Sequence, residues 1–139
     1  MKSNVQYASR VKDDVQNCPV YITSQILGKA WTILILQTLM ALSSKEGLRF
    51  NEIQRDLSWV SPKILSQRLK ELVGEGIISR NIDSSEMPLK VTYTLTRKGE
   101  DLRGVLTLMQ KWGVKHNQES RKRCKSEEFS ACEGCREIT

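Results

Sequence analysis

Residues 51–98, NEIQRDLSWVSPKILSQRLKELVGEGIISRNIDSSEMPLKVTYTLTRK, decide the fold. A short amphipathic helix, Asn51 to Leu57, precedes a turn of three residues. The pair Ser61-Pro62 then opens a second helix, because serine caps a helix N-terminus and proline suits the first helical position. Beyond Gly74 and Gly76, two β-rich runs flank a polar loop. A helix-turn-helix followed by a hairpin has a shape that fits a DNA groove.

The flanking sequence predicts further helices around this segment. A helix over Val20 to Leu27 follows a cap at Cys18 and ends at Gly28. An apolar core helix is expected from Ala30 to Leu42, and it must be covered on most sides. A last helix is capped by Thr96 and carries an apolar stripe. The stripe consists of Leu102, Val105, Leu106, Met109 and Trp112. The expected fold is mainly α with a small β-hairpin (α+β), a winged helix-turn-helix.

The second helix of the motif is strongly two-sided. At 100° per residue, five apolar side chains fall within one half of its circumference. They are Ile64, Leu65, Leu69, Leu72 and Val73. Four polar side chains fall on the opposite half, namely Lys63, Ser66, Gln67 and Lys70. In the preceding helix, Asn51 is the expected N-cap, with Glu52 in the first turn.

The length of the chain indicates the number of domains, and its charge indicates the kind of partner. The chain has 139 residues and a net charge of +6, which suits one domain with short extensions. We divide it into an arm (1–17), a folded domain (18–116) and a cysteine-containing tail (117–139). The domain and arm hold 17 Lys or Arg and 11 Asp or Glu, so they carry the entire excess charge. A basic domain is compatible with a polyanionic partner. The N-terminus has no apolar signal region, and we expect a cytoplasmic protein without membrane contact.

The polar face of the second helix has the chemistry of a recognition helix. Gln67 can pair bidentately with adenine, and Lys63 or Lys70 can reach a guanine or a phosphate. Ser66 adds a short hydrogen-bonding side chain, while Ser61 and the amides at the helix start suit a phosphate. The alternative is that these residues form only the solvated face of an amphipathic helix.

Four further cations are candidates for DNA contacts. Arg68 points toward the edge of the core, so a phosphate contact and a structural role are both open. Arg80 and Lys90 of the hairpin could touch the DNA backbone, but Asp83 and Glu86 near its tip would be repelled by phosphates. Arg49 precedes its helix and is a backbone candidate, although ordinary solvation is an equal alternative.

The four cysteines and the single histidine suggest chemistry beyond DNA binding. Cys18 lies at a helix N-terminus, where unpaired amides favour the thiolate, so it is a candidate redox sensor. The alternative is a small, inert, buried side chain. In the tail, four possible ligands for zinc or another metal occur as H-x7-C-x7-C-x2-C. These are His116, Cys124, Cys132 and Cys135. A disulfide switch and an incidental tail remain open as alternatives, and no cofactor is required.

Several segments between Cys18 and Gly113 resemble the HxlR family of winged-helix transcription regulators, which is related to MarR-type proteins. The matching segments are Cys18-Pro19-Val20, Gly28-Lys29-Ala30-Trp31-Thr32, Ile33-Leu34-Ile35-Leu36, Arg49-Phe50-Asn51-Glu52-Ile53, Ser61-Pro62-Lys63-Ile64-Leu65-Ser66-Gln67-Arg68-Leu69, Gly76-Ile77-Ile78, Pro88-Leu89-Lys90-Val91-Thr92-Tyr93-Thr94-Leu95-Thr96, Gly99 and Leu102. The chain departs from the family pattern at Ala30 and at Trp59-Val60, where glycine is common.

The resemblance implies a homodimer joined through its N- and C-terminal helices and bound to an inverted-repeat DNA operator. It also implies that a cysteine at the position of Cys18 senses oxidants in some members. We therefore expect a dimeric, sequence-specific DNA-binding regulator, with a response to thiol oxidation or to a metal as a further hypothesis. The competing hypothesis is a winged-helix protein-interaction module within a transcription complex. An enzyme is not expected, because the chain lacks a phosphate-binding glycine loop and a paired-carboxylate motif.

Overall fold

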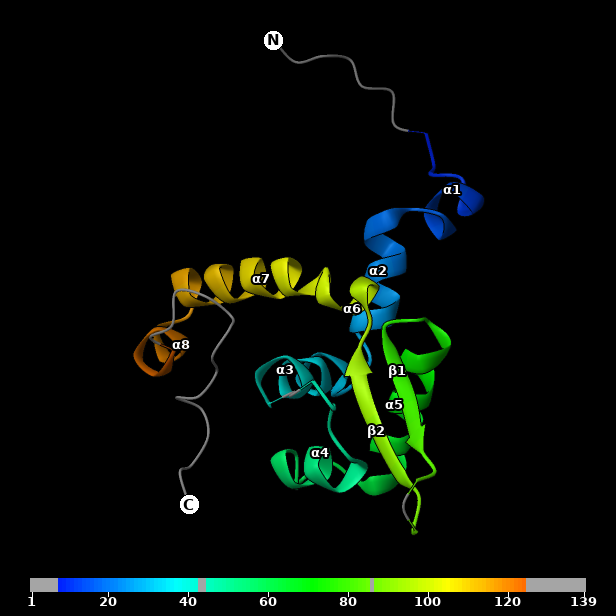
Figure 1. Cartoon of the computed structure of the whole chain (residues 1–139). Helices are drawn as coiled ribbons and strands as arrows, with labels where there is room; N and C mark the ends of the chain where they lie inside the picture. Colours follow the sequence, from blue (N-terminus) through cyan, green and yellow to red (C-terminus); the bar gives the residue numbers. More distant parts are fainter. Residues whose placement is uncertain (1–7, 43–44, 86, 125–139) are drawn as a thin grey trace.

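The computed structural model describes residues 8–42, 45–85 and 87–124. Eight helices and two strands occupy these ranges (Figure 1). They are α1 (Lys12–Gln16), α2 (Pro19–Leu27), α3 (Thr32–Leu42), α4 (Phe50–Asp56), α5 (Pro62–Gly74), β1 (Ile78–Asp83), β2 (Lys90–Leu95), α6 (Arg97–Glu100), α7 (Leu102–His116) and α8 (Gln118–Arg123). The expected winged helix-turn-helix, mainly α with one hairpin, is confirmed.

Helix α3 lies at the centre of the core, because its sequence is apolar around most of its circumference. Ile35, Leu36 and Leu39 are completely buried. The apolar faces of the other elements close around them: Ile53, Leu65, Leu69, Leu72, Ile77, Ile78 and Leu106 are also buried. Burial of each such side chain contributes about 1.5–3 kcal/mol, so this shared core holds α4, α5, the hairpin and α7 to one body.

The turn between α4 and α5 is held by one side chain. The Gln54 Nε2 atom donates to the carbonyl oxygens of Leu57 at 3.2 Å and Val60 at 2.6 Å. Val60 is itself buried beneath the turn. At the start of α5, the Ser61 hydroxyl accepts a hydrogen bond from the Ile64 amide at 3.2 Å, and Pro62 takes the first helical position, as predicted. The angle between the two helices is therefore set by hydrogen bonds at both ends of the turn.

Three predicted helix boundaries were wrong. Arg49, not Asn51, is the N-cap of α4, because the Glu52 carboxylate accepts the Arg49 amide at 2.9 Å and starts the helix earlier. Helix α3 begins at Thr32 rather than Ala30, since Trp31 adopts a left-handed backbone conformation with φ 75°. Thr96 caps only the short α6, and α7 begins separately at Leu102.

The hairpin pairs β1 with β2 in antiparallel register, from Ile78 opposite Leu95 to Asp83 opposite Lys90. The two β-rich runs expected on either side of the polar loop are thus confirmed as β1 and β2. The Leu48 amide and carbonyl pair with Tyr93, which ties the segment before α4 to the hairpin. Gly47 permits this contact: its φ is +83°, and a Cβ there would lie 2.5 Å from the Tyr93 oxygen.

Within the described ranges, no single helix has the length and apolar composition of a membrane span. Of the described helices, only α2 and α3 taken together have that length and composition, and this pair is bent by 79° at its junction.

We predict that Gln54→Met lowers the free energy of unfolding by about 1–2 kcal/mol. Methionine keeps the length of the side chain but removes the N–H groups that hold the turn. Denaturant unfolding measures the change. Asn51→Ala is the matched control on the exposed side of α4, and we expect it to change stability by less than about 0.5 kcal/mol. Equal losses in both variants would show that the turn does not depend on Gln54.

Candidate nucleic-acid interface

Helix α5 separates its side chains into two faces, as the sequence predicted. Leu65, Leu69 and Leu72 are at most 2% exposed and face the core. Lys63, Ser66, Gln67 and Lys70 are all exposed. The polar face is thus brought together on one rigid element and is anchored from behind, which is the arrangement needed to place side chains in a major groove.

Arg68 does not share this exposed face. Its Nε donates to the Ala30 carbonyl at 3.1 Å, and its Nη1 lies 3.2 Å from a Glu71 carboxylate oxygen. Only 14% of the Arg68 side chain is exposed. Of the two roles left open by the sequence, these contacts support the structural one. Arg68 joins α5 to the loop between α2 and α3.

The two hairpin cations have different surroundings. Arg80 is exposed, and the structure gives it no ion pair among the described residues. The Lys90 ammonium lies 3.1 Å from a Glu46 carboxylate oxygen, so Lys90 has an ion-pair partner within the protein. The Asp83 carboxylate is bonded by the hydroxyl and amide of Ser85, which lower its pKa, with a smaller contribution from Lys90.

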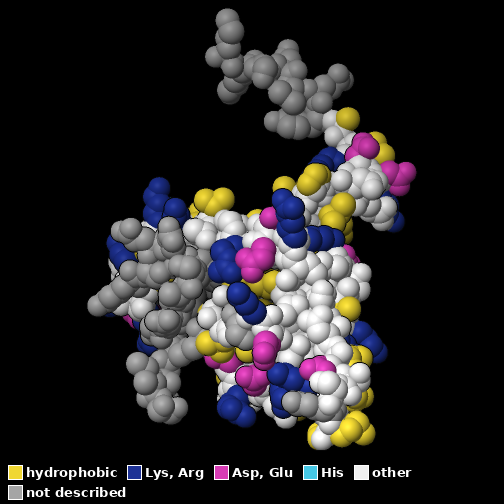
Figure 2. Space-filling view, viewed as in Figure 1, with side chains coloured by type: hydrophobic (Ala, Val, Ile, Leu, Met, Phe, Trp, Pro, Cys, Tyr) yellow, Lys and Arg dark blue, Asp and Glu magenta, His cyan; other side chains and the backbone are white. Residues whose placement is uncertain are grey.

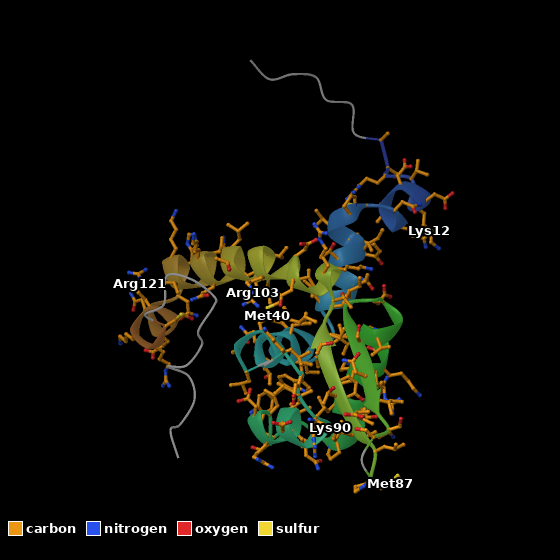
Figure 3. All side chains as sticks on the ribbon, in the orientation of Figure 1. Lys12, Met40, Met87, Lys90, Arg103 and Arg121 are labelled. Atoms are coloured by element: carbon orange, nitrogen blue, oxygen red, sulfur yellow. The ribbon has the colours of Figure 1, made fainter. Side chains whose placement is uncertain are left out.

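The far end of the hairpin is apolar rather than basic. Met87 is 88% exposed at the tip, and Ile82 and Leu89 are exposed beside it (Figures 2 and 3). Glu86 lies outside the described residues. Among the described residues of the hairpin, Arg80 is therefore the cation best placed to meet a phosphate. At the other edge of the motif, Arg49 is exposed at the N-terminus of α4.

Two contacts beside α5 were not foreseen from the sequence. The rings of Trp31 and Trp59 meet edge to face, with their centroids 4.7 Å apart. The Lys29 ammonium lies 3.3 Å from Glu71. Both contacts link the loop before α3 to the helix-turn-helix. Their sequence signal was weak, because nothing in the spacing shows that Trp31 lies near Trp59 or that Lys29 lies near Glu71.

Cys18 is half-buried at the N-cap of α2. Its pKa is lowered, first by hydrogen bonds from the amides of Tyr21 and Val20 and to a smaller extent by the positive charge of Arg10. The expected effect of the helix N-terminus on this thiol is confirmed. A lowered pKa increases the thiolate fraction at neutral pH, and the thiolate is the form that reacts with oxidants and electrophiles.

The proposed metal ligands are not assembled in the described structure. The His116 ring packs against Trp112, with a centroid distance of 4.7 Å. The Cys124 sulfur accepts a hydrogen bond from Gln110 Nε2 at 3.0 Å. Cys132 and Cys135 lie outside the described residues. Among residues 8–42, 45–85 and 87–124, no group of three or more His, Cys, Asp or Glu is placed to hold a metal ion.

The fold and the exposed face of α5 define a winged helix-turn-helix protein of the nucleic-acid-binding type. Residues 26–121, more than half of the chain, match the model of the HxlR-like helix-turn-helix family. The chain belongs to this family. An HTH-type transcriptional regulator from Halalkalibacterium halodurans is 32% identical over 114 residues, which cover 82% of this chain and 96% of that protein.

Solved structures of two redox-related regulators are also similar. The reduced form of the transcriptional regulator YodB from Bacillus subtilis has 38% identity and a TM-score of 0.62, covering 73% of this chain and 96% of that one. YodB has also been solved after diamide treatment and with bound quinone. The redox regulator HypR in its oxidized form has 31% identity and a TM-score of 0.58, covering 72% of this chain and 98% of that one.

Proposed function

We propose that this protein is a homodimeric transcription regulator that binds a specific inverted-repeat DNA sequence and loses affinity when Cys18 is oxidised. Membership in a helix-turn-helix family whose relatives are named as transcriptional regulators supports the general part. The observation that carries the proposal is the exposed polar face of α5, which is held outward by the buried leucines behind it.

In the proposed complex, α5 lies in the major groove and Gln67 reads an adenine. Ser66 contacts a base edge or a phosphate, and Lys63 and Lys70 contact phosphates or guanine. The α5 N-terminus at Ser61 lies against the DNA backbone. Arg49 and Arg80 add backbone contacts at the two flanks. Arg68 and Lys90 are bonded within the protein, so they contribute to the positive potential and to the scaffold rather than to base reading.

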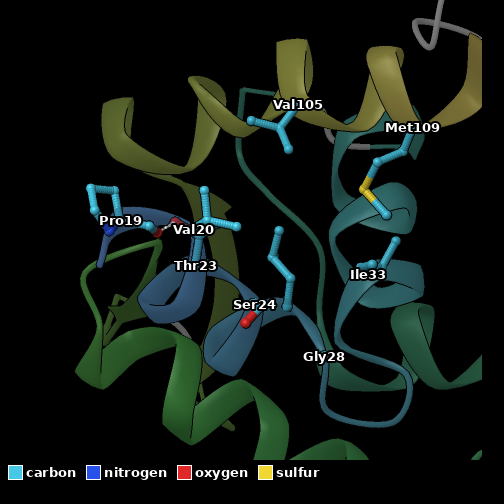
Figure 4. A pocket seen from close by; sticks show the side chains of 9 residues that line it. Pro19, Val20, Thr23, Ser24, Gly28, Ile33, Val105 and Met109 are labelled. Carbon is cyan, nitrogen blue, oxygen red and sulfur yellow. Dashed lines mark hydrogen bonds between the residues drawn. The ribbon is translucent and has the colours of Figure 1, made fainter. Parts of the chain in front are cut away.

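The dimer is supported by two apolar faces that the single chain leaves exposed. On α2, Val20 is 79% exposed, and on α7, Leu108 and Trp112 are 68% and 69% exposed (Figure 2). Between these helices lies an apolar groove of about 550 Å³ (Figure 4). Its lining residues are Pro19, Val20, Thr23, Ser24, Leu27, Gly28, Ile33, Val105 and Met109.

A monomer rarely keeps contiguous apolar surface of this kind, because its burial is favourable. A second copy with the same faces would cover it through a two-fold interface. Two copies of α5 related by such an axis would then meet two half-sites of opposite orientation, which is the basis for an inverted-repeat operator.

The redox part of the proposal rests on the lowered pKa of Cys18 and on its place at the start of α2. The similar regulators YodB and HypR, described in reduced, oxidised, diamide-treated or quinone-bound forms, give it further support. Because α2 carries part of the proposed dimer surface, modification of Cys18 would act on the distance or angle between the two α5 helices.

For DNA recognition, we predict that Gln67→Ala weakens binding to the preferred site by about 1–3 kcal/mol and relaxes preference at one base pair of each half-site. Lys70→Ala should instead weaken binding to all sequences and reduce the salt slope by about 1. Titration of labelled duplexes at several salt concentrations measures both effects. An equal loss of Gln67→Ala on random DNA would contradict base reading. Absent or salt-insensitive binding would favour a protein-interaction module.

For the dimer, we predict that Leu108→Glu gives a monomer and weakens binding to an inverted repeat, because a carboxylate would be buried at the interface. Sedimentation velocity measures the oligomeric state. Leu89→Glu is the matched control, since it makes the same replacement at an exposed leucine of the hairpin. A dimer that survives Leu108→Glu unchanged would place the interface elsewhere.

For redox control, we predict that Cys18→Ser binds DNA as tightly as the wild type under reducing conditions but no longer releases it after diamide treatment. Diamide accepts two electrons and two protons as two thiols join in a disulfide, so Cys18 would form a mixed disulfide with an added low-molecular-weight thiol. Serine keeps the size of the side chain and cannot form this bond. Cys124→Ser is the control and should release DNA normally. Binding before and after diamide, with reversal by a thiol reductant, is the measurement. Normal release by Cys18→Ser would mean that Cys18 is not the sensor.

A further inference from the structure

We infer that Glu71 is a positioning residue for base recognition: its carboxylate orients the side-chain amide of Gln67. The inference deepens the proposed function and rests on the base-reading role of Gln67 given there. Glu71 lies one helical turn after Gln67, so both side chains project from the same side of α5. The Gln67 Nε2 atom lies 3.5 Å from Glu71 Oε1, a long hydrogen bond.

The Glu71 carboxylate is itself held in place by two cations. Arg68 Nη1 lies 3.2 Å from Oε1 and 3.4 Å from Oε2, and the Lys29 ammonium lies 3.3 Å from Oε2. Arg68 is in turn bonded to the Ala30 carbonyl at 3.1 Å. A carboxylate bound on both oxygens has little freedom to rotate. Its charge is also balanced by these cations, so it does not repel a nearby phosphate.

This arrangement determines which end of the Gln67 amide faces inward. A carboxylate only accepts hydrogen bonds, so the NH₂ end of the amide must be directed at Glu71. One N–H of the Gln67 amide is then bonded to Glu71. Its other N–H remains free beside the oxygen of the same Gln67 amide. That pair of groups, one donor next to one acceptor, is the edge that matches N7 and N6 of adenine.

Without Glu71, the Gln67 amide would adopt both orientations and more rotamers, and it would lose conformational entropy on binding to a base. The flipped orientation places the amide oxygen against the carboxylate and is repelled. Glu71 therefore favours the adenine-reading orientation before DNA arrives. Lys29 and Arg68 connect this geometry to the loop that follows α2.

The test compares the base preferences of full-length variants. Glu71→Gln removes the charge but keeps the shape, and Glu71→Asp keeps the charge but shortens the side chain. Glu75→Gln is the matched control: it removes the same charge four residues later, at the C-cap of α5. There the structure gives the side chain no hydrogen bond or ion pair within the described residues. Each protein selects sites from randomised duplexes, and affinities are then measured for the preferred site and its single-base-pair variants.

We expect both Glu71 variants to lose base preference by about two- to tenfold, which is the effect of one hydrogen bond. The loss should occur at the same base pair where Gln67→Ala loses base preference. Preference at the other positions, and all preferences of Glu75→Gln, should stay unchanged. Full retention of preference by both Glu71 variants would overturn the inference. So would an even loss at every position together with a lower melting temperature, because that is the result of a loosened helix. If the wild type selects no sequence, the base-reading role of Gln67 fails first.

Discussion

The burial of the leucines of α5 in the shared core is the constraint on which the rest of the molecule depends. Leu65, Leu69 and Leu72 belong to the same buried cluster as Ile35, Leu36 and Leu39 of α3, so the opposite face of α5 has to point into solvent. A rotation of α5 by half a turn would expose three leucines and bury two lysines, which the free energy of transfer forbids. The exposed polar face is thus a consequence of the core.

The loop between α2 and α3 connects the helix that Cys18 caps to the candidate recognition helix. Helix α2 starts at Cys18 and ends at Leu27. The residues that follow contact α5 and its turn in three ways: Lys29 with Glu71, the Ala30 carbonyl with Arg68, and Trp31 with Trp59. Packed side chains and short ionic contacts, rather than a flexible linker, would therefore transmit a displacement of α2 to α5.

The hairpin of this protein is not strongly basic, unlike the wing that a DNA-binding fold suggests. Lys90 is paired with Glu46, and the tip presents Met87 with apolar neighbours. The structural task of the hairpin is clear from its pairing: Leu48 joins it to the segment before α4, and Ile77 and Ile78 anchor it in the core. In the proposed function, most of the recognition chemistry therefore resides on α5.

The sequence by itself predicted the order of the elements from α2 to β2, the two faces of α5, the cap at Ser61 and the place of Cys18 at a helix N-terminus. These features depend on residues a few positions apart, and helical periodicity and capping act over that range. Only the tertiary structure decided the roles of Arg68, Lys90 and Glu71, because their partners Ala30, Glu46 and Lys29 lie 38, 44 and 42 positions away in the chain. It also decided where α3 begins, since the left-handed Trp31 is kept by contacts with Trp59 and with the loop rather than by its own preference.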